Sequence, residues 1–274
     1  MATNHPSQEH PLGVAISAFN MGRVDDAADI CQRILQGNSD DPAAHQLLAV
    51  LCLHQKKLVE AQLHIASSLK IRPHHVPTLI TAGRIAMARK NMDDALAFFE
   101  NATVILPDAT EPIYMSASVL LEQGNLAAAV NAFVRLVHLN PSNALAWFSL
   151  GSAYQQAGIN IKAVDAFEKA IALDSHQADA WFNLGLIHQD ESHLGEAATA
   201  FSAALQERPD FVEAAVNLGI VMQERGLMQE AMNAYRNAYR LSTDTFGRIA
   251  NALASRPHGR MWINLSQLRQ LLGT

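Results

Sequence analysis

The feature that most constrains this chain is a period of thirty-four residues, which runs without an insertion from Gln8 to Thr245. It divides the chain into seven consecutive units: 8–41, 42–75, 76–109, 110–143, 144–177, 178–211 and 212–245. In every unit the twentieth place is Ala, the eighth is Ala or Gly, and the twenty-fourth is large or apolar. A repeat of this length predicts a solenoid, in which each unit is one small supersecondary element stacked on its neighbours.

Within each unit, apolar residues recur three and four places apart, which predicts two amphipathic helices joined by a short turn. The turn is often marked by glycine, which tolerates the positive φ that ends a helix: Gly22, Gly124, Gly158 and Gly226. Small residues at the eighth and twentieth places let the two helices approach closely. Four units place a proline after the second helix, where it stops that helix: Pro73, Pro107, Pro141 and Pro209.

This pattern resembles the tetratricopeptide repeat, which has Trp, Leu, Gly, Tyr, Ala, Phe, Ala and Pro at the corresponding places. The unit 144–177 matches with Trp147, Leu150, Gly151, Tyr154, Ala163, Phe167 and Ala170. The first two units depart most, with Pro11 and His45 at the tryptophan place. The resemblance implies an all-α, right-handed superhelical solenoid of seven antiparallel helix-pair repeats with a C-terminal capping helix.

We therefore expect three parts: a short polar tail (1–7), seven repeats (8–245), and a capping helix with a basic amphipathic tail (246–274). That last part has no acidic residue and four arginines: Arg248, Arg256, Arg260 and Arg269. Two interpretations stay open for residues 256–274. They cap the solenoid, as the end of a repeat array requires, or they occupy a groove, either their own or that of a second copy, which would give self-association.

In the tetratricopeptide family the first helix of each unit lines a concave peptide-binding surface. Carried over place by place, the family's pattern predicts these groove residues: Phe19, Leu53, Ile80, Arg84, Met87, Tyr114, Leu121, Phe148, Gln155, Phe182, Asn183, Gln189, Asn217 and Gln223. The N-terminal part of the set is apolar with one arginine, and the C-terminal part is rich in amides. The alternative is that some of the apolar members pack against second helices and are not exposed.

Asn183 and Asn217 occupy the sixth place of their units, where the repeats of protein O-glycosyltransferases carry an asparagine that grips a peptide backbone. Solvated polar residues are the alternative. The sequence thus favours a scaffold that binds a peptide or amphipathic segment of a partner protein. Two other functions stay open: a substrate-recognition arm acting in trans for an enzyme such as a protein glycosyltransferase, and a self-assembling structural scaffold.

Several function classes are not expected. A formal net charge of −6 gives no basic surface for nucleic acid, and no apolar run is long enough for membrane insertion. The N-terminus lacks the pattern of a secretory signal, so we expect a cytoplasmic protein. We find no phosphate-binding loop or nucleophile elbow, which predicts neither catalysis nor a cofactor. His188 and His193 do not have zinc-ligand spacing, so no metal is expected.

Overall fold

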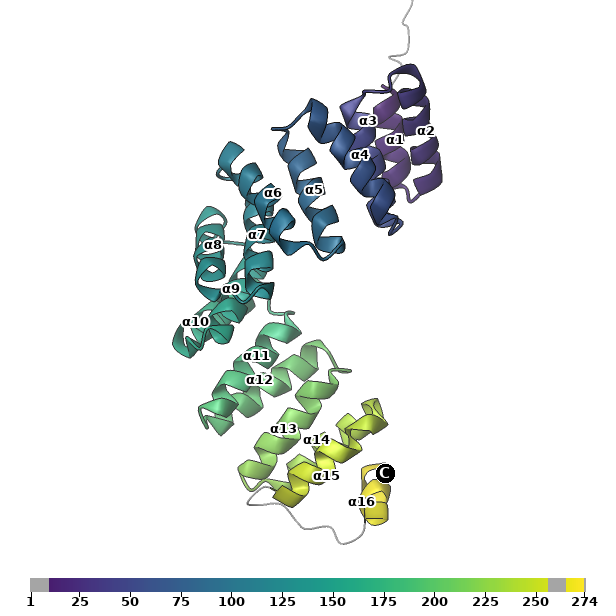
Figure 1. Cartoon of the computed structure of the whole chain (residues 1–274). Helices are drawn as coiled ribbons and strands as arrows, with labels where there is room; N and C mark the ends of the chain where they lie inside the picture. The colour runs from purple at the N-terminus through teal and green to yellow at the C-terminus, as the bar shows by residue number, and fades with distance from the viewer. Residues whose placement is uncertain (1–9, 256–264, 274) are drawn as a thin grey trace, which may run out of the picture. The chain divides into compact units, whose positions relative to one another are not determined.

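The computed structural model describes residues 10–255 and 265–273. The predicted polar tail 1–7 and residues 256–264 of the basic tail lie outside the described residues. The described chain is helical throughout its regular structure, and its helices come in antiparallel pairs (Figure 1). The predicted all-α solenoid of helix pairs is therefore confirmed.

The helices form two compact units, Met1–Leu139 and Asn140–Thr274. In the first unit the pairs are α1 (Pro11–Asn20) with α2 (Val24–Gly37), α3 (Pro42–His54) with α4 (Leu58–Ile71), α5 (Val76–Ala88) with α6 (Met92–Ile105), and α7 (Thr110–Glu122) with α8 (Leu126–Leu139). In the second they are α9 (Ala144–Gln156) with α10 (Asn160–Leu173), α11 (Ala178–Asp190) with α12 (Leu194–Glu207), and α13 (Val212–Glu224) with α14 (Met228–Leu241). A short 3₁₀ turn, η1 (Thr243–Thr245), then leads into α15 (Phe246–Ser255) and α16 (Leu265–Gly273).

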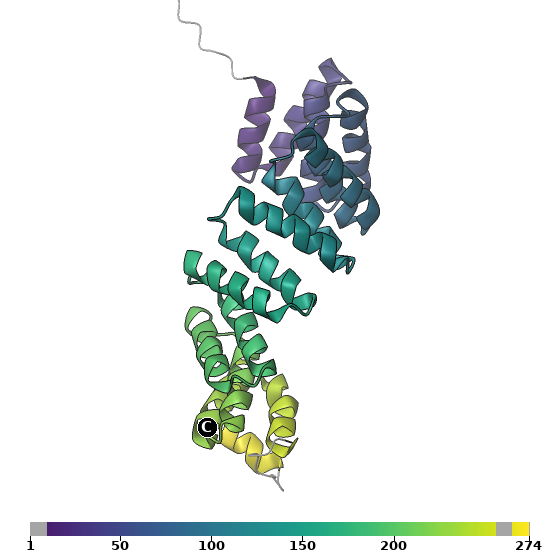
Figure 2. The ribbon, with the colours of Figure 1, turned by 90° about the vertical axis from the view of Figure 1, so that its left-hand side faces the viewer.

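Within each unit the pairs follow one another in chain order, from purple to teal in the first and from green to yellow in the second (Figure 2). Each first helix packs against the second helix of its own pair, and within each unit that second helix packs against the first helix of the next pair. Side chains of the first helices therefore divide between a face that packs and a face that is left outside, and it is this outer face that the sequence predicts to bind a partner.

The turns inside the pairs share one backbone conformation, whether or not they contain glycine. Gly22, Gly124, Gly158 and Gly226 have φ between 71° and 79°, while Lys56, Lys90 and Ser192 adopt φ of 60° to 62° at the same place of their units. In each case the residue after the one with positive φ closes the turn with its backbone N–H. Lys57, for example, donates its backbone N–H to the carbonyl of Cys52 at 2.8 Å. These bonds satisfy the last carbonyls of the first helix, which offsets the cost of the left-handed residue.

In the four repeats whose eighth place is glycine, an aromatic ring fills the space beside it. A Cβ added to Gly151 would lie 2.7 Å from the ring of Phe167, and one added to Gly185 would lie 2.7 Å from that of Phe201. Both rings come from the twenty-fourth place of the same unit and are completely buried. The predicted close approach of the two helices thus depends on glycine facing a ring.

The tryptophans at the fourth place tie first helices to the turn that precedes them. The indole N–H of Trp147 donates to the carbonyl of Pro141 at 2.8 Å, and that of Trp181 donates to the carbonyl of Ser175 at 3.2 Å. Each bond satisfies a carbonyl of the turn that follows the preceding helix.

The end of the second unit is covered by α15 and α16. Leu268 and Leu272 of α16 are buried in one cluster with Tyr235, Ile249 and Leu253. The Arg236 guanidinium donates from Nε to the carbonyl of Leu271 at 2.9 Å, and the Arg269 guanidinium lies 4.5 Å from the ring centroid of Phe246. The predicted capping helix is confirmed, because the described part of the tail packs on its own last pair.

The glycine and ring pairs give a test of the packing. We expect Gly185→Ala to destabilise the protein by about 1–3 kcal/mol, because the Phe201 ring must move to admit the methyl group. Gly195→Ala in the same repeat adds a methyl group that meets nothing within 4 Å, and we expect it to stabilise by about 0.5–1 kcal/mol through helix propensity. Urea unfolding followed by circular dichroism measures both. Equal midpoints for the two variants would contradict this account of the eighth place.

Candidate interaction surfaces

The predicted groove residues of the first unit are only partly exposed. Six of them are half-buried: Phe19, Leu53, Ile80, Met87, Tyr114 and Leu121. Leu53 packs on the buried cluster around Ile65, and Ile80 and Met87 pack on the cluster around Phe99. Arg84 is exposed and has no ion pair among the residues that the structure describes. Packing therefore takes a share of this apolar stripe, as the alternative interpretation of the sequence holds.

Aromatic side chains at the fifth place pack against the aromatic ring at the twenty-fourth place of the same unit. The ring centroids lie 5.9 Å apart for Tyr114 and Phe133, 5.8 Å for Phe148 and Phe167, and 5.7 Å for Phe182 and Phe201. Phe182 also contacts Phe211, with centroids 4.7 Å apart. The three predicted groove aromatics at the fifth place are thus held by rings of their own pair and stay half-buried.

Four predicted amides of the second unit are half-buried: Gln155 on α9, Asn183 and Gln189 on α11, and Asn217 on α13. None of the four side chains has a hydrogen-bond partner within the described chain, so each amide keeps its donors and its acceptor for water or a ligand.

The three helices that carry these amides contain no Lys or Arg. They carry four acids: Asp179, Asp190, Glu213 and Glu224. Asp179 forms a bidentate salt bridge with the Arg208 guanidinium, which also lies 4.4 Å from the ring centroid of Phe211. Asp190 and Glu213 are exposed, so the face around the amides is negatively charged.

Gln223 departs from the prediction, because its side chain is completely buried. Its Nε2 donates to the carbonyl of Ala252 at 3.0 Å, and its Oε1 accepts from the hydroxyl of Tyr235 at 2.9 Å. Ala252 lies near the end of α15, where carbonyls lack an intrahelical donor. Gln223 therefore fastens the cap and is not part of an open surface, which the repeat pattern alone does not reveal.

Two histidines of the second repeat, His45 and His64, have imidazole rings within hydrogen-bond distance of each other. Nδ1 of His45 lies 3.1 Å from Nδ1 of His64, and Nε2 of His45 lies 3.0 Å from the carbonyl of Ser39. Burial, and to a smaller degree His45, lowers the pKa of His64, while Glu60 acts in the opposite sense. Across the described residues, no group of three or more His, Cys, Asp or Glu side chains is arranged to hold a metal ion.

The two cysteines show no sign of a reactive thiol. Burial raises the pKa of Cys31 to about 11, and it also raises the pKa of Cys52. Both thiols therefore stay protonated near neutral pH, and a thiolate is what nucleophilic chemistry requires.

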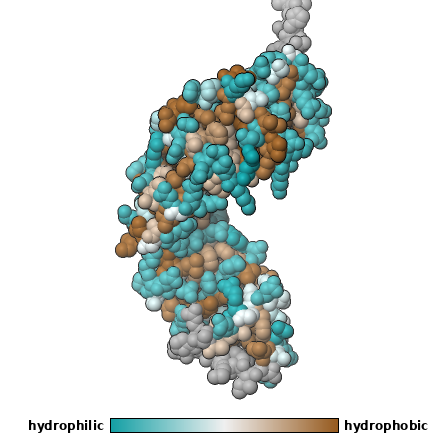
Figure 3. Space-filling model, viewed as in Figure 1, coloured by the Kyte–Doolittle hydropathy of each residue, from teal (hydrophilic) through white to brown (hydrophobic). Residues whose placement is uncertain are grey.

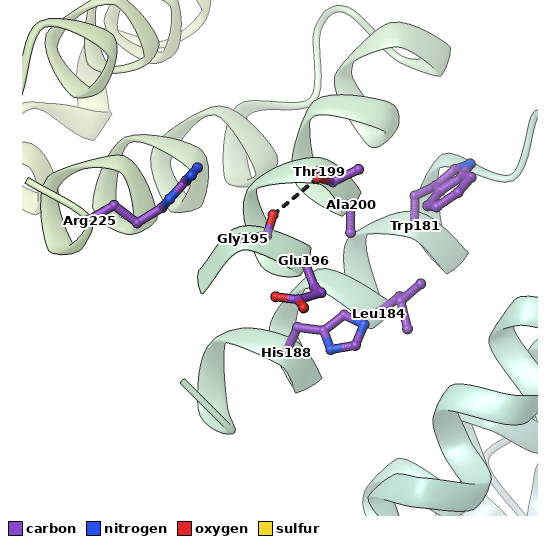
Figure 4. A pocket seen from close by; sticks show the side chains of 8 residues that line it. All are labelled: Trp181, Leu184, His188, Gly195, Glu196, Thr199, Ala200 and Arg225. Carbon is purple, nitrogen blue, oxygen red and sulfur yellow. Dashed lines mark hydrogen bonds between the residues drawn. The ribbon is translucent and has the colours of Figure 1, made fainter. Parts of the chain in front are cut away.

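Three cavities lie away from the predicted groove residues, none of which lines them. Their volumes are about 580, 420 and 570 Å³. The first lies between α11 and α12, with Trp181, Leu184 and His188 on one side and Glu196 and Thr199 on the other (Figure 4). Nδ1 of His188 is buried there without a hydrogen-bond partner.

The cavities recur at equivalent places of different units: the fourth and seventh of the first helix and the twenty-third in the second helix line all three, and the eleventh lines two of them. Sequence reasoning missed them because it followed the second, fifth, ninth and twelfth places. No residue type at the seventh place marks them in the sequence, since that place is Leu184, Val14 and Ser116 in the three cavities.

On the face shown in Figure 3, apolar residues appear in both units as small areas between hydrophilic side chains. Among the helices that the structure describes, none combines the length and apolar character that a membrane span requires.

Comparison with known proteins places these features in a family. Residues 114–177 and 182–244 match the model described as tetratricopeptide repeat. The fold is shared with the C-terminal part of a repeat-containing protein of this type from Cytophaga hutchinsonii, at 15% identity and a TM-score of 0.72, over 88% of this chain and 98% of that one. The chain is a tetratricopeptide-repeat protein. No curated protein sequence matches it.

Further matches agree with this assignment. Residues 20–102 of the tetratricopeptide-repeat chain match the model described as anaphase-promoting complex, cyclosome, subunit 3. The structure of MamA from Desulfovibrio magneticus RS-1 is 18% identical, with a TM-score of 0.58, over 62% of this chain and 96% of that one. YrrB, whose structure is described as having an unusual peptide-binding site, is 18% identical, with a TM-score of 0.56, over 66% and 93%. At these identities the likeness concerns the fold.

The histidine pair gives a pH-dependent prediction. The folded protein lowers the pKa of His64 below its ordinary value of 6.5, so the unfolded chain binds a proton there more readily. The stability that depends on a neutral His64 is therefore fully present above pH 6.5 and is lost as the pH falls below that value. We expect the melting temperature to fall between about pH 7 and pH 5, and to fall less in His64→Gln. The exposed His74→Gln is the control, and an equal pH dependence in all three proteins would contradict the prediction.

Proposed function

We propose that the second unit binds an extended, positively charged segment of a partner protein along the exposed face of α9, α11 and α13. Membership in the tetratricopeptide-repeat family supports a protein-interaction scaffold. The observation that carries the finer proposal is the set of unpaired amides on these three helices, Gln155, Asn183, Gln189 and Asn217.

A carboxamide offers both a donor and an acceptor, as the backbone of an extended peptide does. Asn183 and Asn217 stand at the same place of successive repeats, so they meet such a backbone at two points along its length. Gln223 supports this use of the twelfth place, because its own amide bonds a main-chain carbonyl, that of Ala252. Gln155 and Gln189 stand at that same place with their amides unpaired.

The charge of the face favours a basic segment. Asp190 and Glu213 are exposed beside the amides, and α9, α11 and α13 hold no Lys or Arg of their own, while the nearby Arg208 is already paired with Asp179 and also interacts with Glu213. Exposed charges of this kind affect mainly the choice of partner and the rate of association, and salt weakens their interactions with the partner.

Two other functions use the same features differently. A substrate-recognition arm acting in trans would present the same face, because it also depends on Asn183 and Asn217. A self-assembling scaffold would need the basic tail to leave its place, since α16 packs with Leu268 and Leu272 buried on its own last pair. The burial of these two side chains favours the cap.

An array of immobilised twelve-residue peptides, varied in net charge at constant apolar content, tests the proposal with the full chain. We expect the bound peptides to be rich in Lys and Arg. We also expect Asn183→Ala with Asn217→Ala to weaken binding of the best peptide about tenfold, because each lost hydrogen bond contributes about 0.5–1.5 kcal/mol. The matched control combines Gln206→Ala and Asn237→Ala, which alter exposed amides on second helices. Preference for acidic peptides, or equal loss in both double variants, would overturn the proposal.

A further inference from the structure

The second repeat carries histidines at two places where later repeats carry tryptophan and alanine. His45 stands at the fourth place, on α3, and His64 stands at the twenty-third place, on α4. The repeats that have tryptophan at the fourth place have alanine at the twenty-third, Ala166 and Ala200. The two imidazoles lie in the first unit, on helices that do not carry the amides discussed above.

The fold fixes the orientation of the His45 ring. Its Nε2 lies 3.0 Å from the carbonyl of Ser39, which stands at the thirty-second place of the unit before. The indole N–H of Trp147 makes the corresponding bond, to the carbonyl of Pro141. A carbonyl oxygen only accepts, so Nε2 of a neutral His45 carries the proton and Nδ1 keeps its lone pair.

Nδ1 of His45 faces the same atom of His64. The two Nδ1 atoms lie 3.1 Å apart. A zinc ion binds an imidazole nitrogen at about 2.0–2.1 Å, so two nitrogens on one ion lie about 2.8–3.4 Å apart for bond angles of about 90–110°. The spacing of this pair therefore suits two ligands of one metal ion, as well as the hydrogen bond that a shared proton makes without the ion.

The surroundings of the pair suit a cation. A histidine that binds a metal commonly donates its other N–H to a carbonyl, which holds the ring and its tautomer, and Ser39 accepts such a bond from His45. Glu60, which is exposed one helical turn before His64, interacts electrostatically with that imidazole and adds negative charge. Both histidines are only half-buried, so the pair is not sealed in the core.

We propose that His45 and His64 form a two-histidine site for a divalent transition-metal ion such as Zn²⁺, which both rings bind through Nδ1. The ion takes the place of the shared proton, and that proton moves to Nε2 of His64, so both rings stay neutral. Among the described residues no third His, Cys, Asp or Glu completes a metal-binding group, so water fills the other coordination positions. Spacing along the chain does not reveal the site, because its ligands stand nineteen residues apart on different helices.

Calorimetric titration of the untagged full chain with ZnCl₂, at about pH 7.5 where imidazoles are neutral, tests the proposal. We expect His45→Gln and His64→Gln each to weaken Zn²⁺ binding at least about tenfold, because even the loss of a group that only orients a ligand costs about that much. Mg²⁺, which prefers oxygen ligands, should not bind to the pair. The matched control combines His188→Gln and His193→Gln, whose rings also lie close together, and should leave the Zn²⁺ binding unchanged.

Nitrogen-15 NMR of the histidine side chains in the unsubstituted chain identifies the ligating atoms and does not depend on whether the variants fold. We expect equimolar Zn²⁺ to shift the Nδ1 resonances of His45 and His64 and to leave Nε2 of His45 protonated. Absence of Zn²⁺ binding, binding that survives both single substitutions, or Nδ1 resonances that do not respond would overturn the proposal.

Discussion

The packing of this solenoid depends on the approach of two helix backbones across the residue at the twenty-fourth place, which is an aromatic ring in the last five repeats. At Gly151 and Gly185 there is no room for a methyl group, because the rings of Phe167 and Phe201 occupy that space. The ring is in turn completely buried between the helices of its pair. Interiors packed at this density transmit any change in volume to their neighbours. The period of thirty-four residues persists because each repeat must solve the same packing problem in the same register.

That constraint divides the surface of each first helix into side chains that pack and side chains that remain available. Fifth-place aromatics such as Tyr114 and Phe148 pack against the buried ring, so they contribute to stability and stay half-buried. Amides such as Asn183 and Gln189 have no role in the packing, and they keep their hydrogen-bonding capacity. The proposed peptide-binding surface uses the side chains that packing leaves available, which are the unpaired amides on α9, α11 and α13.

The helix pairs and their register could be predicted from the sequence, because the small residues, the large twenty-fourth residue and the turn glycines all act locally within a unit. The status of Gln223 could not, since it depends on α15, which follows the last complete repeat and offers the carbonyl of Ala252. The extent to which Ile80 and Met87 are buried against the cluster around Phe99 could not be predicted from the sequence either. The cavity lined by Ser116 could not be predicted either, because it depends on how the three helices α6, α7 and α8 pack.

The hydrogen bond from Gln223 to Ala252 has a consequence for how the array can be lengthened. Gln155 and Gln189 stand at the same place in earlier repeats without bonding a neighbour, so those units are interchangeable modules at this position. The seventh repeat is joined to its cap through Gln223, whose Oε1 accepts from the Tyr235 hydroxyl of the same repeat. Duplication of an internal module preserves this junction, whereas a unit placed between the seventh repeat and its cap would separate the buried Gln223 Nε2 from the carbonyl of Ala252. Growth of the array is therefore compatible with internal copying and not with terminal addition.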